Sequence, residues 1–124
     1  MSQDIIADTL NQMMNAKRSR KDFVVIHKHS KLLLSLLDIA KDHGYVKEYK
    51  VDGRNLKIEL GKFMECNAIK PRFNVFIGGI EKYMRRYLPA RDMGILIIST
   101  NKGLMTHQEA IEKNAGGVLM AYFY

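Results

Sequence analysis

Apolar and polar residues follow a helical period in some parts of the chain and a strand period in others. Apolar side chains at helical spacing over residues 5–16 predict a first helix. The short β-branched run at 23–26 predicts a strand. A leucine stripe begins after Ser30, which is suited to cap a second helix, and Gly44 is suited to end that helix.

Residues 56–60 alternate between apolar and charged side chains, which is typical of a strand buried on one face. Just before them, Asp52 and Gly53 form a pair suited to the positive φ angles of a two-residue hairpin turn. The order helix, strand, helix, strand, strand predicts a small two-layer N-terminal domain over residues 1–64. We expect its boundary to fall within residues 61–66.

The second half of the chain predicts a β-rich domain over residues 65–124. Residues 69–76 look extended, and Pro71 restricts that segment to an edge strand or an unpaired amide. Residues 80–87 carry apolar side chains on one side and cations on the other, which predicts a short helix before the next proline. Residues 118–124 predict a final strand. The whole chain is therefore expected to be an α/β protein of the α+β type, with two small domains.

The most informative stretch joins a buried strand to a capped helix through polar residues. The continuous apolar run at 95–98 predicts a strand covered on both faces. Thr106 and Glu109 form a capping box at the start of one short helix that is expected to reach about residue 114. Between these elements lies a loop, here called the polar tip, that consists of Ser99, Thr100, Asn101, Lys102 and Gly103. Because both of its ends are anchored, we expect the polar tip to be rigid.

Composition narrows the possible partners. The 124 residues can bury one modest core or two small ones. Lysine and arginine number 20 against 13 acidic residues, and this net charge of +7 favours a polyanion such as nucleic acid or an anionic membrane. A basic protein without such a partner is the alternative. The longest apolar run is about seven residues, against roughly 20 for a membrane-spanning helix. The first residues do not resemble a signal peptide, so we expect a cytosolic chain.

Chemistry other than binding has little support in the sequence. Cys66 is the only cysteine, and we expect it to be a small buried hydrophobe. His27 and His29 could share a strand face and hold a metal, but no third ligand stands at a telling distance, so a basic surface is the simpler interpretation. His107 is expected to be exposed. Ser99 has no identifiable base, so we expect no catalytic residue, metal or cofactor. An RNA-processing enzyme that uses Ser99 or His107 remains an alternative.

The polar tip suits RNA better than it suits a reaction. Small hydroxyl and amide side chains can enter the wide minor groove of A-form RNA and bond to 2′-hydroxyls and base edges. Basic and aromatic residues interleave over residues 62–91, although most of these rings are expected to be core. An ordinary polar turn is the alternative for Ser99, Thr100 and Asn101.

Motifs along essentially the whole chain resemble one known family. They are Asp8-Thr-Leu-Asn-Gln-Met-Met-Asn15-Ala16, Ser30-Lys31-Leu32, His43-Gly44-Tyr45-Val46, Cys66-x-x-Ile69-x-Pro71-Arg72-Phe73, Leu88-Pro89-Ala-Arg91, and Met105-Thr106-His-Gln-Glu109-Ala110 followed by Gly116-Gly117. In this order they resemble the small-subunit ribosomal protein eight family, and the C-terminal motifs resemble its archaeal and eukaryotic branch.

The resemblance implies a structural constituent of the small ribosomal subunit, without a reaction or a cofactor. It implies a primary rRNA-binding protein that binds a central-domain helix of 16S rRNA and helps assemble the subunit platform. Its other implied partners are neighbouring small-subunit proteins and its own mRNA; no membrane partner is implied. We expect a monomer when the protein is free. A regulatory RNA-binding module that acts outside the ribosome is the remaining alternative.

The resemblance also assigns RNA contacts. The polar tip carries the main contact, with Asn101 standing where the bacterial pattern has serine. Gly116 and Gly117 are expected to approach the same RNA, because glycine permits close backbone access. Further expected RNA contacts are Lys31, which matches a basic position of the family, and Arg72 and Arg91 as phosphate partners.

Overall fold

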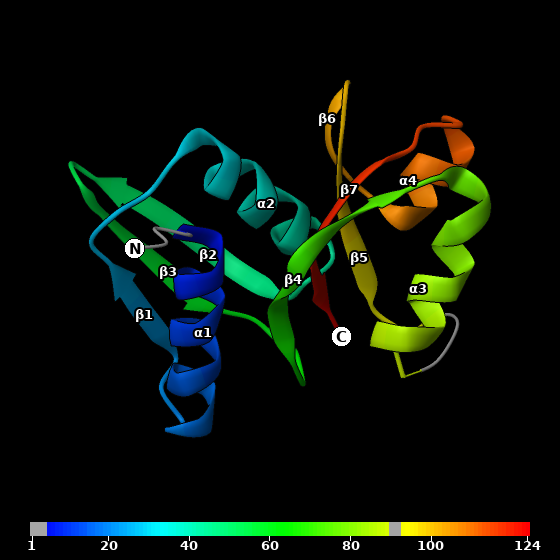
Figure 1. Ribbon diagram of the computed structural model, residues 1–124. Coiled ribbons are helices and arrows are strands. Elements are labelled where there is room, and N and C mark those ends of the chain that lie inside the picture. Colours follow the sequence, from blue (N-terminus) through cyan, green and yellow to red (C-terminus); the bar gives the residue numbers. More distant parts are fainter. Residues whose placement is uncertain (1–4, 90–92) are drawn as a thin grey trace. The chain divides into compact units, whose positions relative to one another are not determined.

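The computed structural model describes residues 5–89 and 93–124. The chain divides into two compact units, and the boundary falls between Asn67 and Ala68. The boundary expected from the sequence stands three residues earlier, after residue 64. Each unit combines helices with a sheet of its own (Figure 1), which confirms the expected α+β class.

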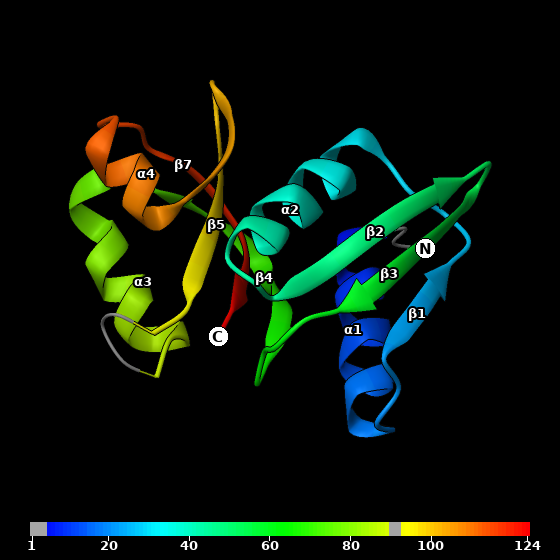
Figure 2. The same ribbon diagram turned by 180° about the vertical axis from the view of Figure 1, so that it is seen from behind.

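The N-terminal unit has the expected order of helix, strand, helix, strand, strand. Its elements are α1 (Ile5–Arg18), β1 (Phe23–Ile26), α2 (Lys31–Asp42), β2 (Val46–Asp52) and β3 (Asn55–Leu60). The strands form a three-stranded sheet in the order β1-β3-β2, in which both pairs are antiparallel. Both helices cover the same face of this sheet (Figures 1 and 2), so the unit has two layers.

Three helices end in the same way, with a residue in the left-handed conformation after the last turn. Those residues are Arg20 after α1, Gly44 after α2 and Asn114 after the last helix, α4 (His107–Glu112), with φ angles of 61°, 82° and 54°. After α1, the amide of Lys21 donates back to the carbonyl of Ala16 at 2.9 Å. Equivalent bonds close the other two helices, which is the Schellman arrangement. Two of these three positions therefore carry a side chain where glycine is usual.

The hairpin between β2 and β3 turns one residue later than expected. Asp52 pairs with Asn55, so the two turn residues are Gly53 and Arg54. Gly53 has a φ angle of +61°. A type II′ turn requires a positive φ at its first turn residue only, and glycine adopts this angle without strain. Asp52 therefore stays in the strand, and the prediction of an Asp52-Gly53 turn is wrong by one position.

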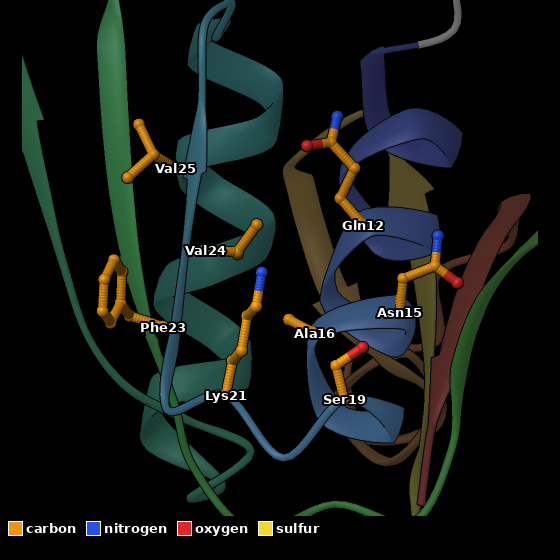
Figure 3. A pocket seen from close by; sticks show the side chains of 8 residues that line it. All are labelled: Gln12, Asn15, Ala16, Ser19, Lys21, Phe23, Val24 and Val25. Atoms are coloured by element: carbon orange, nitrogen blue, oxygen red, sulfur yellow. The ribbon is translucent and has the colours of Figure 1, made fainter.

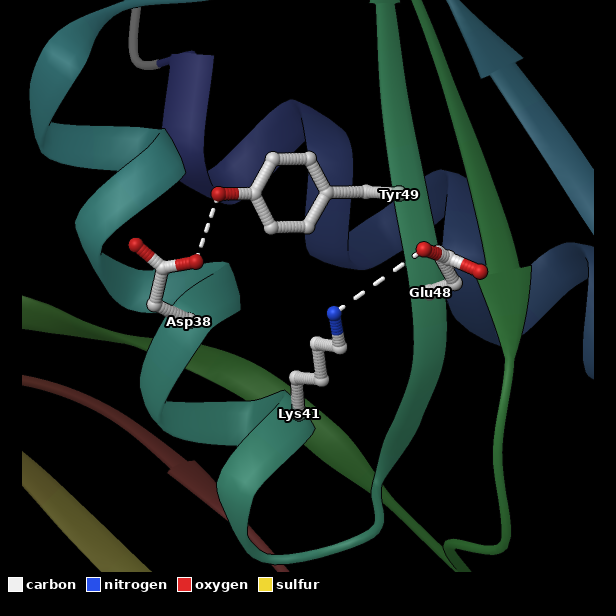
Figure 4. Close-up of polar contacts among 4 residues, drawn as sticks. All are labelled: Asp38, Lys41, Glu48 and Tyr49. Atoms are coloured by element: carbon white, nitrogen blue, oxygen red, sulfur yellow. Dashed lines mark hydrogen bonds and ion pairs between the residues drawn. The ribbon is translucent and has the colours of Figure 1, made fainter.

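Polar contacts join α2 to β2 at the surface (Figure 4). The Tyr49 hydroxyl donates to Asp38 Oδ1 at 2.5 Å, and Lys41 Nζ lies 4.0 Å from Glu48 Oε1. The bond to Asp38, together with a smaller contribution from burial, raises the pKa of Tyr49 to about 12. An exposed ion pair adds little to stability, so the apolar core between the helices and the sheet holds this unit together. Its main buried side chains are Leu10, Met13, Leu33, Leu36, Leu37, Leu56 and Ile58.

The C-terminal unit is built around a second sheet. Its elements are β4 (Cys66–Val75, of which residues 66 and 67 still belong to the N-terminal unit), the 3₁₀ helix η1 (Ile77–Gly79), α3 (Ile80–Tyr87), β5 (Ile95–Thr100), β6 (Gly103–Thr106), α4 (His107–Glu112) and β7 (Gly117–Phe123). The strand order is β4-β7-β5-β6. β4 therefore stands at an edge, where a strand that contains proline is tolerated.

Two helices cover one face of this second sheet (Figures 1 and 2). The predicted helix at 80–87 is confirmed as α3, and Leu88 adopts an extended conformation before Pro89, as the residue before a proline usually does. α4 is shorter than expected and ends at Glu112. The apolar cluster beneath the two helices consists of Ile69, Val75, Ile80, Leu88, Leu96, Ile98, Met105, Ala110 and Leu119.

Candidate RNA interface

The polar tip is the end of a β-hairpin and not a loop between a strand and a helix. β5 continues through Ser99 and Thr100, and β6, which the sequence did not predict, begins at Gly103. Thr100 pairs with Gly103 across the hairpin. Only Asn101 and Lys102 therefore remain in the turn, and both are exposed. The polar tip is expected to be rigid because the paired strands β5 and β6 support its residues.

The Thr100 side chain stabilises the turn itself. Its hydroxyl accepts from the Lys102 amide at 3.1 Å and donates to the Gly103 carbonyl at 2.9 Å. A threonine hydroxyl has one proton and two acceptor lone pairs, so one acceptor site remains for another partner. Gly103 has a φ angle of +109°, which a residue with a side chain adopts only under strain. Thr100 and Gly103 together set the shape of the turn before any partner binds.

Ser99 has a different environment in the same hairpin. It pairs with Leu104 in β6 and with Val118 in β7, and its side chain is half-buried. The part of the chain that the structure describes offers no hydrogen-bond partner to the Ser99 hydroxyl. This hydroxyl can therefore donate and accept toward a ligand without losing an internal bond.

Gly116 and Gly117 lie beside the hairpin, at the start of β7. A Cβ on Gly117 would stand 2.1 Å from the carbonyl oxygen of Ser99, and a Cβ on Gly116 would stand 2.8 Å from that of Val75. Neither glycine has a positive φ angle. Both are therefore required by close approach to this protein's own strands. This reason differs from the expected close approach to RNA.

Phe76 is a surface residue of this end of the sheet that sequence reasoning missed. Its Cα lies 3.6 Å from the Cβ position of Gly116, and its side chain is 81% exposed. Because residues 69–76 look extended and apolar side chains in strands are usually buried, the Phe76 ring was expected in the core. The sequence did contain one signal for exposure: Phe76 follows the last residue of β4 and stands just before the glycine pair 78–79, where the strand has ended.

The capped helix after the hairpin is confirmed, with one correction. Thr106 Oγ1 accepts from the Glu109 amide at 3.2 Å, which is the first of the two bonds of a capping box. His107, expected to be exposed, is 1% exposed. Its Nδ1 accepts from the Leu96 amide at 3.1 Å, so this ring joins α4 to β5. The helical first turn faces the sheet here, which a capping motif alone does not reveal.

The remaining predicted RNA contacts are only partly described. Lys31 is the exposed first residue of α2 in the N-terminal unit. Arg72 belongs to β4, but its side chain lies outside the described part of the chain, and so does all of Arg91.

Other candidate chemical groups have structural partners. His27 Nδ1 lies 3.0 Å from Asn55 Oδ1, and His29 Nε2 lies 3.0 Å from the Gly53 carbonyl oxygen, so both rings contact the β2–β3 hairpin. Cys66 is buried as expected, and burial raises the pKa of its thiol to about 12. Within residues 5–89 and 93–124, no cluster of three or more potential metal ligands is found. No helix of the described chain is long and apolar enough to cross a membrane.

An open groove of about 560 Å³ lies between α1 and the free edge of β1 (Figure 3). Gln12 and Asn15 line it from α1 and Ser19 from the turn that follows; Val24 points toward α1, whereas Phe23 points away from it. The groove mixes amide and hydroxyl groups with apolar surface. Its polar groups can form hydrogen bonds.

Comparison with known proteins gives full-length matches of one kind. A family model for ribosomal protein S8 matches residues 4–124. The small ribosomal subunit protein uS8 of Nanoarchaeum equitans is 47% identical over 129 residues and is covered completely, as is this chain. The small ribosomal subunit protein uS8A of Schizosaccharomyces pombe is 38% identical over 127 residues, with 98% of each chain covered. Its counterpart uS8A in Saccharomyces cerevisiae is 38% identical over 125 residues, which cover 97% of this chain and 96% of that one.

These matches place the chain among the structural proteins of the small ribosomal subunit, and not among enzymes. Within that class, the chain belongs to the ribosomal protein S8 family. The relatives come from an archaeon and from yeasts, which confirms the resemblance to the archaeal and eukaryotic branch.

Proposed function

We propose that this protein binds a helix in the central domain of 16S-like rRNA and helps assemble the platform of the small subunit. The contact is made by the polar tip together with the start of β7. The observation that carries this proposal is the combination of a preformed turn with an available hydroxyl. Thr100 holds the turn through two internal bonds, while Ser99 next to it has no such bond among the described residues.

The geometry supports a division of tasks within the polar tip. Ser99 donates and accepts toward base edges or 2′-hydroxyls in an irregular minor groove. Asn101 adds an exposed amide, and Lys102 adds a cation for phosphate. Thr100 mainly keeps these groups in place. Recognition by a preformed turn avoids the ordering cost that a flexible loop would incur on binding.

Phe76 extends the same surface. Its backbone stands beside Gly116 and its side chain is exposed, and Gly117 in turn contacts Ser99, so these four residues form one continuous edge. An exposed ring is a platform on which an unpaired base can stack. A helix with an extruded or unpaired base therefore suits this surface better than a regular duplex does. Gly116 and Gly117 contribute by letting the neighbouring backbones at Val75 and Ser99 approach closely at this edge.

Lys31, Arg72 and Arg91 complete the proposal as phosphate contacts. Such contacts fix orientation and carry no sequence information. Each one that binds should contribute to the dependence of affinity on salt. Replacing Arg72 or Arg91 with alanine should therefore flatten this dependence without changing the preference for the central-domain helix.

The test is the affinity for a central-domain rRNA fragment at fixed salt. Ser99→Ala should weaken binding by about 1 to 3 kcal/mol, because a buried hydrogen bond to the RNA is lost. Thr100→Ser is the matched control, since it keeps the hydroxyl that holds the turn. Unchanged affinity of Ser99→Ala, in protein with a native circular dichroism spectrum, would remove the Ser99 hydroxyl, the group that carries the proposal, from the mechanism.

A further inference from the structure

α3 presents a cationic face that the contact through the polar tip does not use. Lys82, Arg85 and Arg86 are exposed on this helix. Together with Gly78 and Glu81 they line an open groove of about 480 Å³. The side chains that anchor the helix, with Ile80 buried and Tyr83, Met84 and Tyr87 packed against the core, lie on the opposite side. The cations are therefore held outward by a helix whose position is fixed.

The charge of Lys82, unlike those of Arg85 and Arg86, is not accounted for by a contact among the described residues. Arg85 Nη2 binds Glu81 Oε1 at 3.0 Å, one turn away, and Arg86 lies over the Tyr87 ring at 5.5 Å. Both arginines also stand in the last turn, where cations favour the negative end of the helix dipole. Lys82 stands in the first turn, where a cation opposes that dipole, and the described residues give it no ion-pair partner. Its charge opposes the helix dipole without an ion pair among residues 5–89 and 93–124 that would offset this cost.

We propose that this face of α3, called the α3 groove, binds phosphate groups of a second stretch of small-subunit rRNA. Lys82 and Arg86 hold the phosphates, and Gly78 leaves space for the backbone, because no atom lies within 4 Å of its Cβ position. Contacts to phosphate oxygens carry no sequence information, so this contact is independent of the RNA sequence. This inference rests on the proposed function, since it assumes that rRNA surrounds the protein.

Two RNA probes separate this contact from the one made by the polar tip. One probe is the short central-domain fragment, and the other is the complete small-subunit rRNA. The test variant is Lys82→Ala with Arg86→Ala, which leaves the bond between Arg85 and Glu81 intact. The matched control removes the same charge from the N-terminal unit through Lys47→Ala with Lys50→Ala; both lysines are exposed.

With the complete rRNA, the test variant should lose about two phosphate contacts. Between about 50 and 200 mM salt, the affinity of the unmodified protein should then fall roughly 7- to 12-fold further than that of the variant. With the short fragment the two proteins should agree within about twofold. Equal behaviour of the test and control variants on the complete rRNA would overturn the α3 groove as a specific contact.

A cross-linking experiment decides the class of partner. Lys82 is replaced with the photoreactive residue p-benzoylphenylalanine, and the protein is assembled into small subunits before irradiation. Attachment to rRNA is the expected result, whereas attachment only to another protein, or no attachment, would overturn the proposal. Failure of the contact through Ser99 would appear separately, as insensitivity of short-fragment binding to Ser99→Ala.

Discussion

Gly117→Ala should break the contact between β7 and the polar tip. The new Cβ would stand 2.1 Å from the Ser99 carbonyl oxygen, whereas an ordinary contact needs at least 3.4 Å. The two backbones would have to part by about 1.3 Å, which is enough to weaken the adjoining strand hydrogen bonds. Overpacking costs about 1 to 3 kcal/mol, and one lost hydrogen bond adds about 1 kcal/mol. We therefore expect the free energy of unfolding to fall by about 2 to 4 kcal/mol.

The assay is urea denaturation followed by circular dichroism. At about 2 kcal/mol per molar urea, the midpoint should fall by about 1 to 2 M. Gly78→Ala is the matched control, because its Cβ meets no atom within 4 Å and its φ angle is not in the left-handed region. It should change stability by less than about 0.5 kcal/mol. Equal midpoints for the two variants would refute the argument that Gly117 is required by the approach of Ser99.

Three further predictions concern Arg20, Cys66 and Tyr49. Arg20→Gly should raise the free energy of unfolding, measured in urea, by up to about 1 kcal/mol, because Arg20 adopts a left-handed φ of 61°. Asn114→Gly should raise it less, because asparagine tolerates this conformation better than arginine does, and an equal gain would contradict the strain argument. Cys66 should resist alkylation in the folded protein at about pH 8.5 and react in urea. Because the pKa of its thiol is about 12 in the folded protein, only the unfolded thiol ionises between about pH 9 and 12, so the free energy of unfolding should fall as pH rises through this range. Asp38→Asn should lower the pKa of Tyr49 from about 12 toward 10, measured by the ultraviolet absorbance of tyrosinate, and an unchanged titration would exclude the hydrogen bond as the cause.

Helix ends and periodic strands could be predicted from the sequence because their signals are local. Ser30, Thr106 and Gly44 act on backbone groups within one turn, so residue type alone identifies them. The strand at 56–60 was recognised because its alternation reports burial on one face. These features need no knowledge of the rest of the fold.

The parts that could not be predicted depend on neighbours distant in sequence. Ser99 and Thr100 look like loop residues by composition, but pairing with β6 and β7 makes them strand residues. His107 follows a helix cap and would be exposed on an isolated helix, but α4 packs this ring against β5. The sequence predicts Gly117 as a point of close approach to RNA, whereas strand packing shows that it is required by the close approach of the Ser99 carbonyl.

The central claim is that the polar tip contacts the central domain of the small-subunit rRNA, and directed hydroxyl-radical probing tests it most directly. Asn101→Cys supplies an exposed thiol for an iron chelate, while the buried Cys66 stays unlabelled. After assembly into small subunits, strand cleavage should cluster on the two strands of one central-domain helix. Cleavage confined to other domains, or none above the level of the unlabelled protein, would contradict the claim.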